Sequence, residues 1–350
     1  MGELYLIQPG TQLHRHRNGL ALFRGRRRIR SIPVESLDRI VVSGDVTLAP
    51  SAVELVLRRR IDTVFLGWSG RYLGRLSGGL GKNVFLRLQQ YNRLQDEAFR
   101  LVTARAIVSA KVDSQLALVG ARLKDTASET LRRGRRLLQE TRAAVPAAGD
   151  LASLRGHEGR AAAVYFRCFA GLLRPGDFAF AGRNRRPPRD PVNVLLSLGY
   201  TLLLSAMDRE IAAVGLDPGL GCFHEMAYGR PSLPLDLVEE FRAPAVDALV
   251  LRAVNRREFR ITDFYFPDAM AEEARRLPEF DELRREAPVI LTHGGFHKFI
   301  RLFEQRLGER VAVDGGRQTL RGLVRRQAGR FARAVRGEEP YLPTRWEAND

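Results

Sequence analysis

The chain has 350 residues, enough for two domains, and 45% of them are hydrophobic, enough for buried cores. Its 57 basic and 40 acidic residues leave a net charge of +17, which favours a phosphate-bearing partner such as a nucleic acid. Two cysteines are too few for a disulfide framework or a cysteine-based zinc site, and we expect a soluble, cytoplasmic protein without membrane segments because neither a signal-peptide pattern nor a long apolar run occurs.

The first 76 residues have the pattern of a small β domain. Short segments rich in β-branched and aromatic residues alternate with turns, as in DRIVVSGDVTL (38–48) and TVFLGWSGRYLGRL (63–76). One helix is expected among them, because the apolar residues of SAVELVLRRR have helical spacing between Pro50 and Arg60. The basic run RGRRRIR, from Arg24 to Arg30, indicates the turn of a β hairpin.

Beyond a glycine-rich join at 77–83 the pattern becomes helical. The stretch from Val84 to Leu123 contains no proline and carries a repeating apolar stripe, which predicts one long helix or a helix pair. Breaks such as AAVPAAGD and GLDPGLG separate further helical segments. We therefore expect a β domain over 1–76 that dimerises, a linker and helix start over 77–98, an all-α catalytic domain over 99–336, and a tail over 337–350.

Glu158 is the first candidate site residue. In LASLRGHEGRAAAVYFRCFAGLL it shares one helical face with Leu154, Ala162, Tyr165 and Phe169. A carboxylate on an apolar face needs a metal ion, a basic partner or an exit to solvent. This segment alone favours the second explanation, an intrahelical partner such as Arg155 or a buried salt bridge.

The stretch LGCFHEMAYGRPSLPLDLVEEFRAP (220–244) supplies further candidates. Ser232 as a cap and Pro234 as an early helical proline predict a helix from about Leu233. Asp236 and Glu239 then share a face, and His224 lies before them in a loop that can fold back onto the helix. An imidazole with carboxylates suits Mn²⁺ or Mg²⁺ rather than structural zinc. Acids in a first helical turn are also favoured by the helix dipole without any function.

Other features are weaker. His293 and His297 in THGGFHKF are four apart, but two glycines between them argue against a rigid helical pair and for a turn or for DNA-facing residues. The arginine-rich break RNRRPPRD and the predicted helix RQTLRGLVRRQAGRFARAVR, with a buried face from Leu320 to Val335, suggest contacts with phosphates, although solvated surface explains each one separately. The candidate DNA-binding residues are Arg183, Arg185, Arg186, Arg189, Arg317, Arg321 and Arg325.

Taken together, several of these pieces resemble a known family. The segments NVFLRLQQYNR, HEGRAAAVYF, FAGRNRRPPRDPVNVLLSLGYTLL and GLDPGLGCFHEMAYGRPSLPLDLVEEFR, with SIPVESLDRIVVSGDV near the start, are similar to the CRISPR-associated adaptation integrase, the endonuclease of spacer acquisition. The resemblance covers nearly the whole chain. It implies an N-terminal β domain, a C-terminal α domain, and a homodimer that joins a small ferredoxin-like partner protein in an integration complex on DNA.

The resemblance also implies that Glu158, His224 and Glu239 bind a divalent metal, with Asp236 as the neighbouring family acid and Glu240 left out. Such a site can neutralise phosphate oxygens and stabilise a leaving alkoxide. We expect attack on the CRISPR repeat by a DNA 3′-hydroxyl of a captured fragment, or by water in a simple nuclease reaction. His224 could instead shuttle a proton. Two other functions stay open: a non-catalytic nucleic-acid-binding scaffold, and a metal-dependent nuclease unrelated to integration.

Overall fold

The computed structural model describes residues 2–67, 70–76, 78, 83–123, 128–174, 176, 178–184, 187–266 and 288–346. The chain forms two compact units. Unit 1 comprises residues 1–80, 186–201 and 262–298, and unit 2 comprises 81–185, 202–261 and 299–350. The sequence-based boundaries differ from this division, because two later segments join the β domain. In unit 1, Leu198 packs so closely on Gly70 that a Cβ there would clash with it, a contact that local sequence texture does not reveal.

The N-terminal part of unit 1 is built from short strands and one helix, as expected. Its elements are β1 (Gly2–Leu6), β2 (Thr11–His16), β3 (Gly19–Arg24), β4 (Arg27–Ile32), β5 (Leu37–Ser43), β6 (Val46–Leu48), α1 (Pro50–Arg58), β7 (Asp62–Leu66) and β8 (Tyr72–Leu76). The basic run begins at a hairpin turn, in which Gly25 takes a positive φ of 57°, and continues along β4. The predicted helix is α1, which ends two residues earlier than expected.

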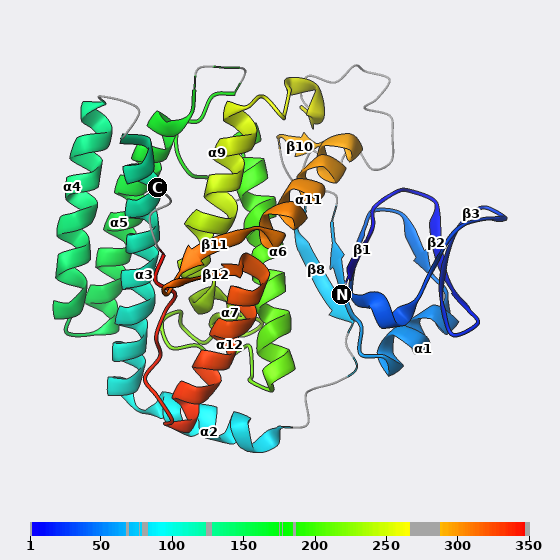
Figure 1. The fold of residues 1–350 in the computed structure, drawn as a ribbon, viewed down its shortest axis with the longest axis horizontal. Coiled ribbons are helices and arrows are strands. Elements are labelled where there is room, and N and C mark those ends of the chain that lie inside the picture. Colours follow the sequence, from blue (N-terminus) through cyan, green and yellow to red (C-terminus); the bar gives the residue numbers. More distant parts are fainter. Residues whose placement is uncertain are drawn as a thin grey trace. The chain divides into compact units, whose positions relative to one another are not determined.

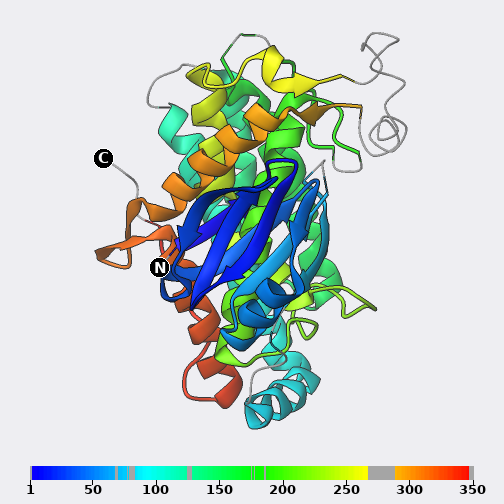
Figure 2. The same ribbon diagram turned by 90° about the vertical axis from the view of Figure 1, so that its right-hand side faces the viewer.

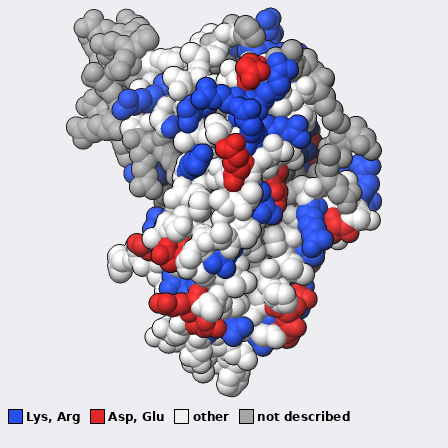
Figure 3. Space-filling model, turned by 90° about the vertical axis from the view of Figure 1, so that its left-hand side faces the viewer, with Lys and Arg blue, Asp and Glu red and all other residues white. Residues whose placement is uncertain are grey.

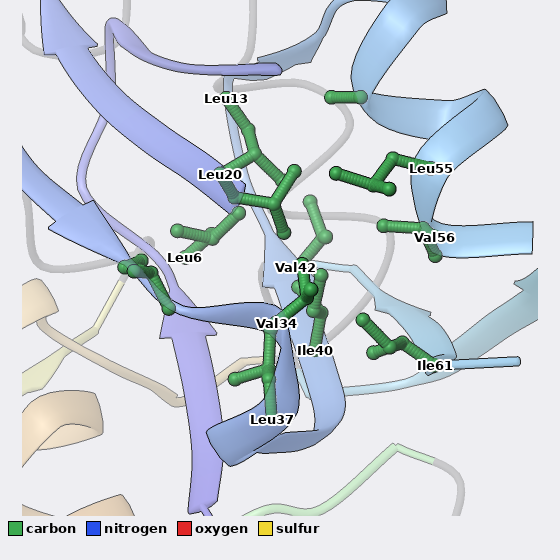
Figure 4. Close-up of a cluster of buried hydrophobic side chains, with 12 residues drawn as sticks. Leu6, Leu13, Leu20, Val34, Leu37, Ile40, Val42, Leu55, Val56 and Ile61 are labelled. Atoms are coloured by element: carbon green, nitrogen blue, oxygen red, sulfur yellow. The ribbon is translucent and has the colours of Figure 1, made fainter. Parts of the chain in front are cut away.

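These strands form two four-stranded sheets, visible in blue in Figure 2. One has the order β1-β5-β7-β8 and the other β4-β3-β2-β6. Apolar side chains of both sheets and of α1 share one core, in which Leu13 and Leu20 lie close to Leu55 of the helix (Figure 4). Burial of these side chains, each worth about 1.5–3 kcal/mol, stabilises a domain of strands that are individually short.

The C-terminal half is helical but not all-α. A short antiparallel pair joins β9 (Phe264–Tyr265) to β10 (Ile290–Leu291) in unit 1. The next helix, α11 (His293–Gly308), begins at once, so the expected turn at 293–297 is wrong. A Cβ on Gly295 would clash with the carbonyl of Asp263 and with Leu291. This glycine therefore reflects close packing at a helix start rather than a break in the helix.

Unit 2 is a bundle of helices (Figure 1). Its main elements are α2 (Val84–Gln95), α3 (Glu97–Leu123), α4 (Glu129–Ala144), α5 (Leu151–Leu172), α7 (Ser232–Leu237), α8 (Glu239–Phe241), a π-helical segment (Arg242–Asp247) and α9 (Ala248–Asn255). The predicted long helix or helix pair is the pair α2 and α3. Helices α3, α4 and α5 pack side by side, with Gly134 of α4 against Cys168 of α5.

The end of the chain adds a hairpin and a long helix. Strands β11 (Arg310–Val313) and β12 (Gly316–Thr319) pair through a tight turn and lead into α12 (Leu320–Arg336). Arg317 therefore lies on a strand and not on the predicted helix, because Asp314 and Gly315 take positive φ values and turn the chain just before it. The apolar face of α12 from Leu320 to Val335 is buried as expected.

One helix in the described part of the chain, α6 (Pro191–Val214), is long and apolar enough to cross a membrane. Its apolar window has a mean hydropathy of 1.2, and 72% of that window is buried inside the protein. This burial is the pattern of a core helix.

Candidate active site

Three helices of unit 2 bring two carboxylates to one ammonium group. Glu158 projects from the middle of α5, Glu239 from the start of α8, and Lys111 from α3. The Lys111 Nζ atom contacts Glu158 Oε1 and lies 2.6 Å from Glu239 Oε2. The side chain of Glu158 is 24% exposed, whereas those of Lys111 and Glu239 are 7% and 4% exposed. The cluster is thus buried on the Glu239 side and open to solvent beside Glu158.

Glu239 is held in its ionised form. Burial acts to raise the pKa of Glu239, but Arg242, Lys111 and His224 together lower it to about 2. The Arg242 Nη2 atom lies 3.3 Å from Glu239 Oε1. Glu239 Oε2 is buried and accepts no hydrogen bond of good geometry from the described residues, although Lys111 Nζ is close. Glu239 is therefore a buried, charged carboxylate, with Lys111 beside one oxygen and Arg242 beside the other.

His224 is fixed by Asp236. The loop before α7 folds back so that Asp236 Oδ1 lies 2.7 Å from His224 Nδ1. The same carboxylate accepts hydrogen bonds from the backbone N–H groups of Cys222, Phe223 and His224, at 2.6, 3.0 and 2.8 Å. Because an ionised carboxylate only accepts hydrogen bonds, Nδ1 donates in this contact, and Nε2 keeps its lone pair whenever the ring is neutral.

The structure also decides between alternatives that the sequence left open. Arg155 is not the partner of Glu158, because its guanidinium pairs with Glu225 and the carbonyl of Phe223. The second alternative, a buried salt bridge, is present with Lys111. Ser232 is not a cap but the first residue of α7, and its hydroxyl donates to the carbonyl of Glu225. Among the described residues, no three His, Cys, Asp or Glu side chains are grouped so that they could hold a metal ion. Lys111 lies between the two glutamates.

Glu240 points away from this cluster into a separate buried network. Its carboxylate accepts hydrogen bonds from the Tyr341 hydroxyl at 2.7 Å, from the Thr344 backbone N–H at 2.7 Å and from Gln327 at 3.1 Å. Burial raises the pKa of Glu240 to about 7, even though all of these hydrogen bonds act to lower it. The contacts tie the C-terminal segment to α8, and they explain why an acid stands next to Glu239 without joining the site.

The sequence-based candidates for DNA contacts lie in different surroundings. Arg321 pairs with Glu304 and Arg325 with Glu210, so part of their charge is already balanced. Arg317 is exposed on β12, and Arg183 donates to the carbonyl of Asn184. Arg189 is exposed, and Arg185 and Arg186 lie outside the described residues.

Sequence reasoning missed Lys111 and a cluster of arginines on α4. Arg132, Arg133, Arg135 and Arg136 of α4 are all exposed, as are Arg160 and Arg167 of α5. Figure 3 shows the face over these helices, where Lys and Arg side chains gather in the upper half and acidic ones lie mostly below. The signal for Lys111 was its rarity, because the chain has only four lysines and this one interrupts an apolar helix.

A carboxylate pair bridged by a lysine, beside an aspartate-bound histidine in a basic helical domain, defines a candidate active site of an enzyme that acts on nucleic acids. The family description "CRISPR associated protein Cas1" matches residues 4–277, and the chain belongs to this family. It is 34% identical to CRISPR-associated endonuclease Cas1 3 of Thermus thermophilus, over 98% of this chain and 97% of the relative. The fold is similar to a CAS1 protein from Thermotoga maritima, with a TM-score of 0.78 and 27% identity over 97% of this chain and 99% of that one. It is also similar to a chain of a Cas6-RT-Cas1–Cas2 complex, with a TM-score of 0.82 and 24% identity over 100% of this chain and 36% of that one.

Proposed function

We propose that this protein is a divalent-metal-dependent DNA endonuclease and integrase that inserts captured DNA fragments into a CRISPR array. Membership of the Cas1 family supports the class of activity. The observation that carries the metal-dependent mechanism is the convergence of Glu158 and Glu239, from separate helices, on a single cationic point. Carboxylates this close need a cation to balance them; in this structure it is the Lys111 ammonium, and in the proposed active form it is a divalent metal ion.

The donor atoms suit Mg²⁺ or Mn²⁺. Glu158 and Glu239 offer carboxylate oxygens, one of them a buried oxygen without a well-formed hydrogen bond, and His224 offers the Nε2 lone pair that Asp236 leaves available. We assign Glu158, His224 and Glu239 as the metal ligands and Asp236 as the residue that orients the histidine. A carboxylate behind a ligating histidine fixes its tautomer and raises its basicity.

A bound Mg²⁺ or Mn²⁺ would supply positive charge for the non-bridging phosphate oxygens and the leaving alkoxide. The protein residues do the positioning. Glu158 sits at the solvent-open side of the cluster, where a phosphodiester can reach it, while Glu239 stays ionised inside. The nucleophile in this mechanism is a DNA 3′-hydroxyl or water, so no protein side chain has to form a covalent intermediate. His224 is the group placed to take or return a proton if it does not act as a ligand.

DNA is held by arginines, which bind the phosphate backbone without reading bases. The exposed arginines lie on α5, which carries Glu158, and on α4, which packs against α5, and they join the sequence-based candidates as proposed contacts. The proposed assembly is a homodimer with a small ferredoxin-like adaptation protein. The fold that this chain shares with a chain of the solved Cas6-RT-Cas1–Cas2 complex is consistent with a partner protein in the assembly.

The decisive experiment compares Glu158→Gln with Glu225→Gln. Glu225 is an exposed neighbour that pairs with Arg155, so its variant controls for a lost charge near the site. Each protein is incubated with supercoiled plasmid, a short duplex and Mn²⁺, with and without EDTA, and DNA binding is measured in parallel. We expect Glu158→Gln to bind DNA but to lose about 100-fold or more of its strand transfer, with Glu225→Gln close to the parent. Full activity of Glu158→Gln would refute the metal assignment, and cutting without strand transfer would point to a simple nuclease.

A further inference from the structure

Lys111 occupies an unusual position for a lysine. Its side chain is 7% exposed, and its ammonium contacts both Glu158 and Glu239, which come from two other helices. The only other lysine in the described part of the chain, Lys298, pairs with Asp263 and has a side chain that is 29% exposed. The contrast shows that Lys111 is built into the centre of the site rather than onto its rim.

The charges explain what this ammonium does in the free protein. Two ionised carboxylates at contact distance of one point repel each other, and burial strengthens the repulsion. Arg242 balances Glu239 from one side only, through Oε1. Without Lys111 the remaining oxygens would face each other uncompensated, and α5 and α8 would be pushed apart at this point. Lys111 therefore holds the two glutamates at the spacing that the structure shows.

An ammonium group and a divalent cation make competing demands on the same oxygens. Both need direct contact with Glu158 and Glu239, and two cations cannot share that space without strong repulsion. We propose that Lys111 is a positioning residue that keeps Glu158 and Glu239 together before the divalent cation binds, and that cation binding displaces its ammonium from the glutamate pair. This inference rests on the proposed function, because the cation in question is the proposed Mg²⁺ or Mn²⁺.

The inference predicts that removal of the Lys111 charge strengthens metal binding. Lys111→Met keeps the apolar stem of the side chain but removes the competing charge. A neighbouring opposite charge changes the proton affinity of a carboxylate by about 10- to 1,000-fold, so the variant should bind Mn²⁺ at least about tenfold more tightly than the parent. Its metal-free form should melt at a lower temperature, and Mn²⁺ should raise that temperature by more than it does in the parent.

The binding test is calorimetric titration of the full-length protein with Mn²⁺ at pH 8, with Lys298→Met as the matched control. We expect tighter binding by Lys111→Met and unchanged binding by Lys298→Met. If the parent binds no Mn²⁺, the proposed function itself fails. If the parent binds Mn²⁺ and Lys111→Met binds it equally or more weakly, the proposed function stands and the displacement of Lys111 is refuted.

A second test keeps Lys111 in place and observes it directly. The chain has four lysines, so a protein labelled with ¹³C at the lysine ε carbon gives few signals, and variants of the other three assign that of Lys111 by elimination. Titration with diamagnetic Mg²⁺ should shift the Lys111 signal in step with binding and leave the Lys298 signal in place. A Lys111 signal that stays fixed while Mg²⁺ binds would overturn the inference.

Discussion

Asp236 and His224 are joined twice through one oxygen. Asp236 Oδ1 accepts the backbone N–H of His224 at 2.8 Å and lies 2.7 Å from its ring Nδ1. The other oxygen accepts the N–H groups of Cys222 and Phe223, and the aspartate is fully buried. One side chain thus sets both the path of the loop and the direction of the imidazole that the loop carries.

Replacement of Asp236 by asparagine should therefore disturb both functions. The amide group would place a donor against N–H donors, so we expect a lower melting temperature and about a 10- to 100-fold loss of Mn²⁺ affinity and of strand transfer, as for other residues behind a metal ligand. Calorimetry and a strand-transfer assay measure the two effects. Asp263→Asn, which breaks an ion pair with Lys298 outside the site, is the control. Parental metal affinity in Asp236→Asn would show that His224 does not depend on this contact.

The buried Glu240 predicts a pH dependence of stability. Burial raises its pKa from 4.5 to about 7 in the folded protein. The folded state thus binds a proton more tightly than the unfolded state, so this group contributes stability that is fully present below pH 4.5 and is lost as the pH rises to about 7. The full change is about 3 kcal/mol. Glutamine at this position does not titrate. As the pH rises across this range, the parent should therefore lose stability relative to Glu240→Gln.

Thermal melts of both proteins from pH 4.5 to pH 8 measure this difference directly. The comparison does not depend on the absolute stability of Glu240→Gln, because it uses only how the stability difference between the two proteins changes with pH. Tyr341→Phe removes one donor to Glu240 but leaves the carboxyl in place, so it should retain a pH dependence over a similar range. A difference that stays constant with pH would show that Glu240 titrates alike in both states.

Gly134 predicts a steric effect in the packing of α4 on α5. A Cβ at this position would collide with the sulfur of Cys168. Gly134→Ala should therefore destabilise unit 2 by about 1–3 kcal/mol, despite the better helix propensity of alanine. Gly156→Ala in α5 meets open space and should raise stability by about 0.5–1 kcal/mol. Melting temperatures test the pair, and the cost of Gly134→Ala should fall when Cys168 is also alanine. An equal gain in melting temperature from Gly134→Ala and Gly156→Ala would contradict the close packing of Gly134 on Cys168.

These particular residues also show what the sequence could predict. Helix α1, the α2–α3 pair and the buried face of α12 follow from the period of apolar residues, which depends only on local order. The division of the chain into two units and the glycine inside α11 depend on contacts between distant segments. The strand that carries Arg317 was missed for a local reason, the tight turn at Asp314 and Gly315. Gly295 illustrates the limit of sequence reasoning. A glycine is found both in loops and where two segments pack closely, and only the structure shows that Gly295 packs against Asp263.

The same distinction applies to the site. The fold-back of the His224 loop onto the segment of Asp236 was predictable from spacing and from a proline-marked helix start. The partner of Glu158 was not, because Lys111 lies on another helix, 47 residues earlier in the chain. Local spacing favoured Arg155, which instead binds the loop before α7. Charge balance predicts that a buried carboxylate has a partner, but only the packing of α3 on α5 identifies it.

The basic face of α4 provides the last prediction, which concerns DNA binding. Arg133 and Arg136 are exposed and form no ion pair with any residue that the structure describes, whereas Arg321 and Arg325 are paired with Glu304 and Glu210. The double variants Arg133→Gln/Arg136→Gln and Arg321→Gln/Arg325→Gln remove the same charge, so a difference between them reports direct phosphate contact. We expect the α4 variant to bind duplex DNA more weakly and its log affinity to depend less steeply on log salt, by about 0.9 for each lost contact. The α12 variant should keep nearly the parental slope, because its arginines are already engaged by carboxylates.

Affinities measured by fluorescence anisotropy between 50 and 200 mM salt, roughly the range in which such contacts show, give both slopes. A larger loss of slope in the α12 variant would place the DNA on the arginines first suggested by the sequence and remove α4 from the proposed interface.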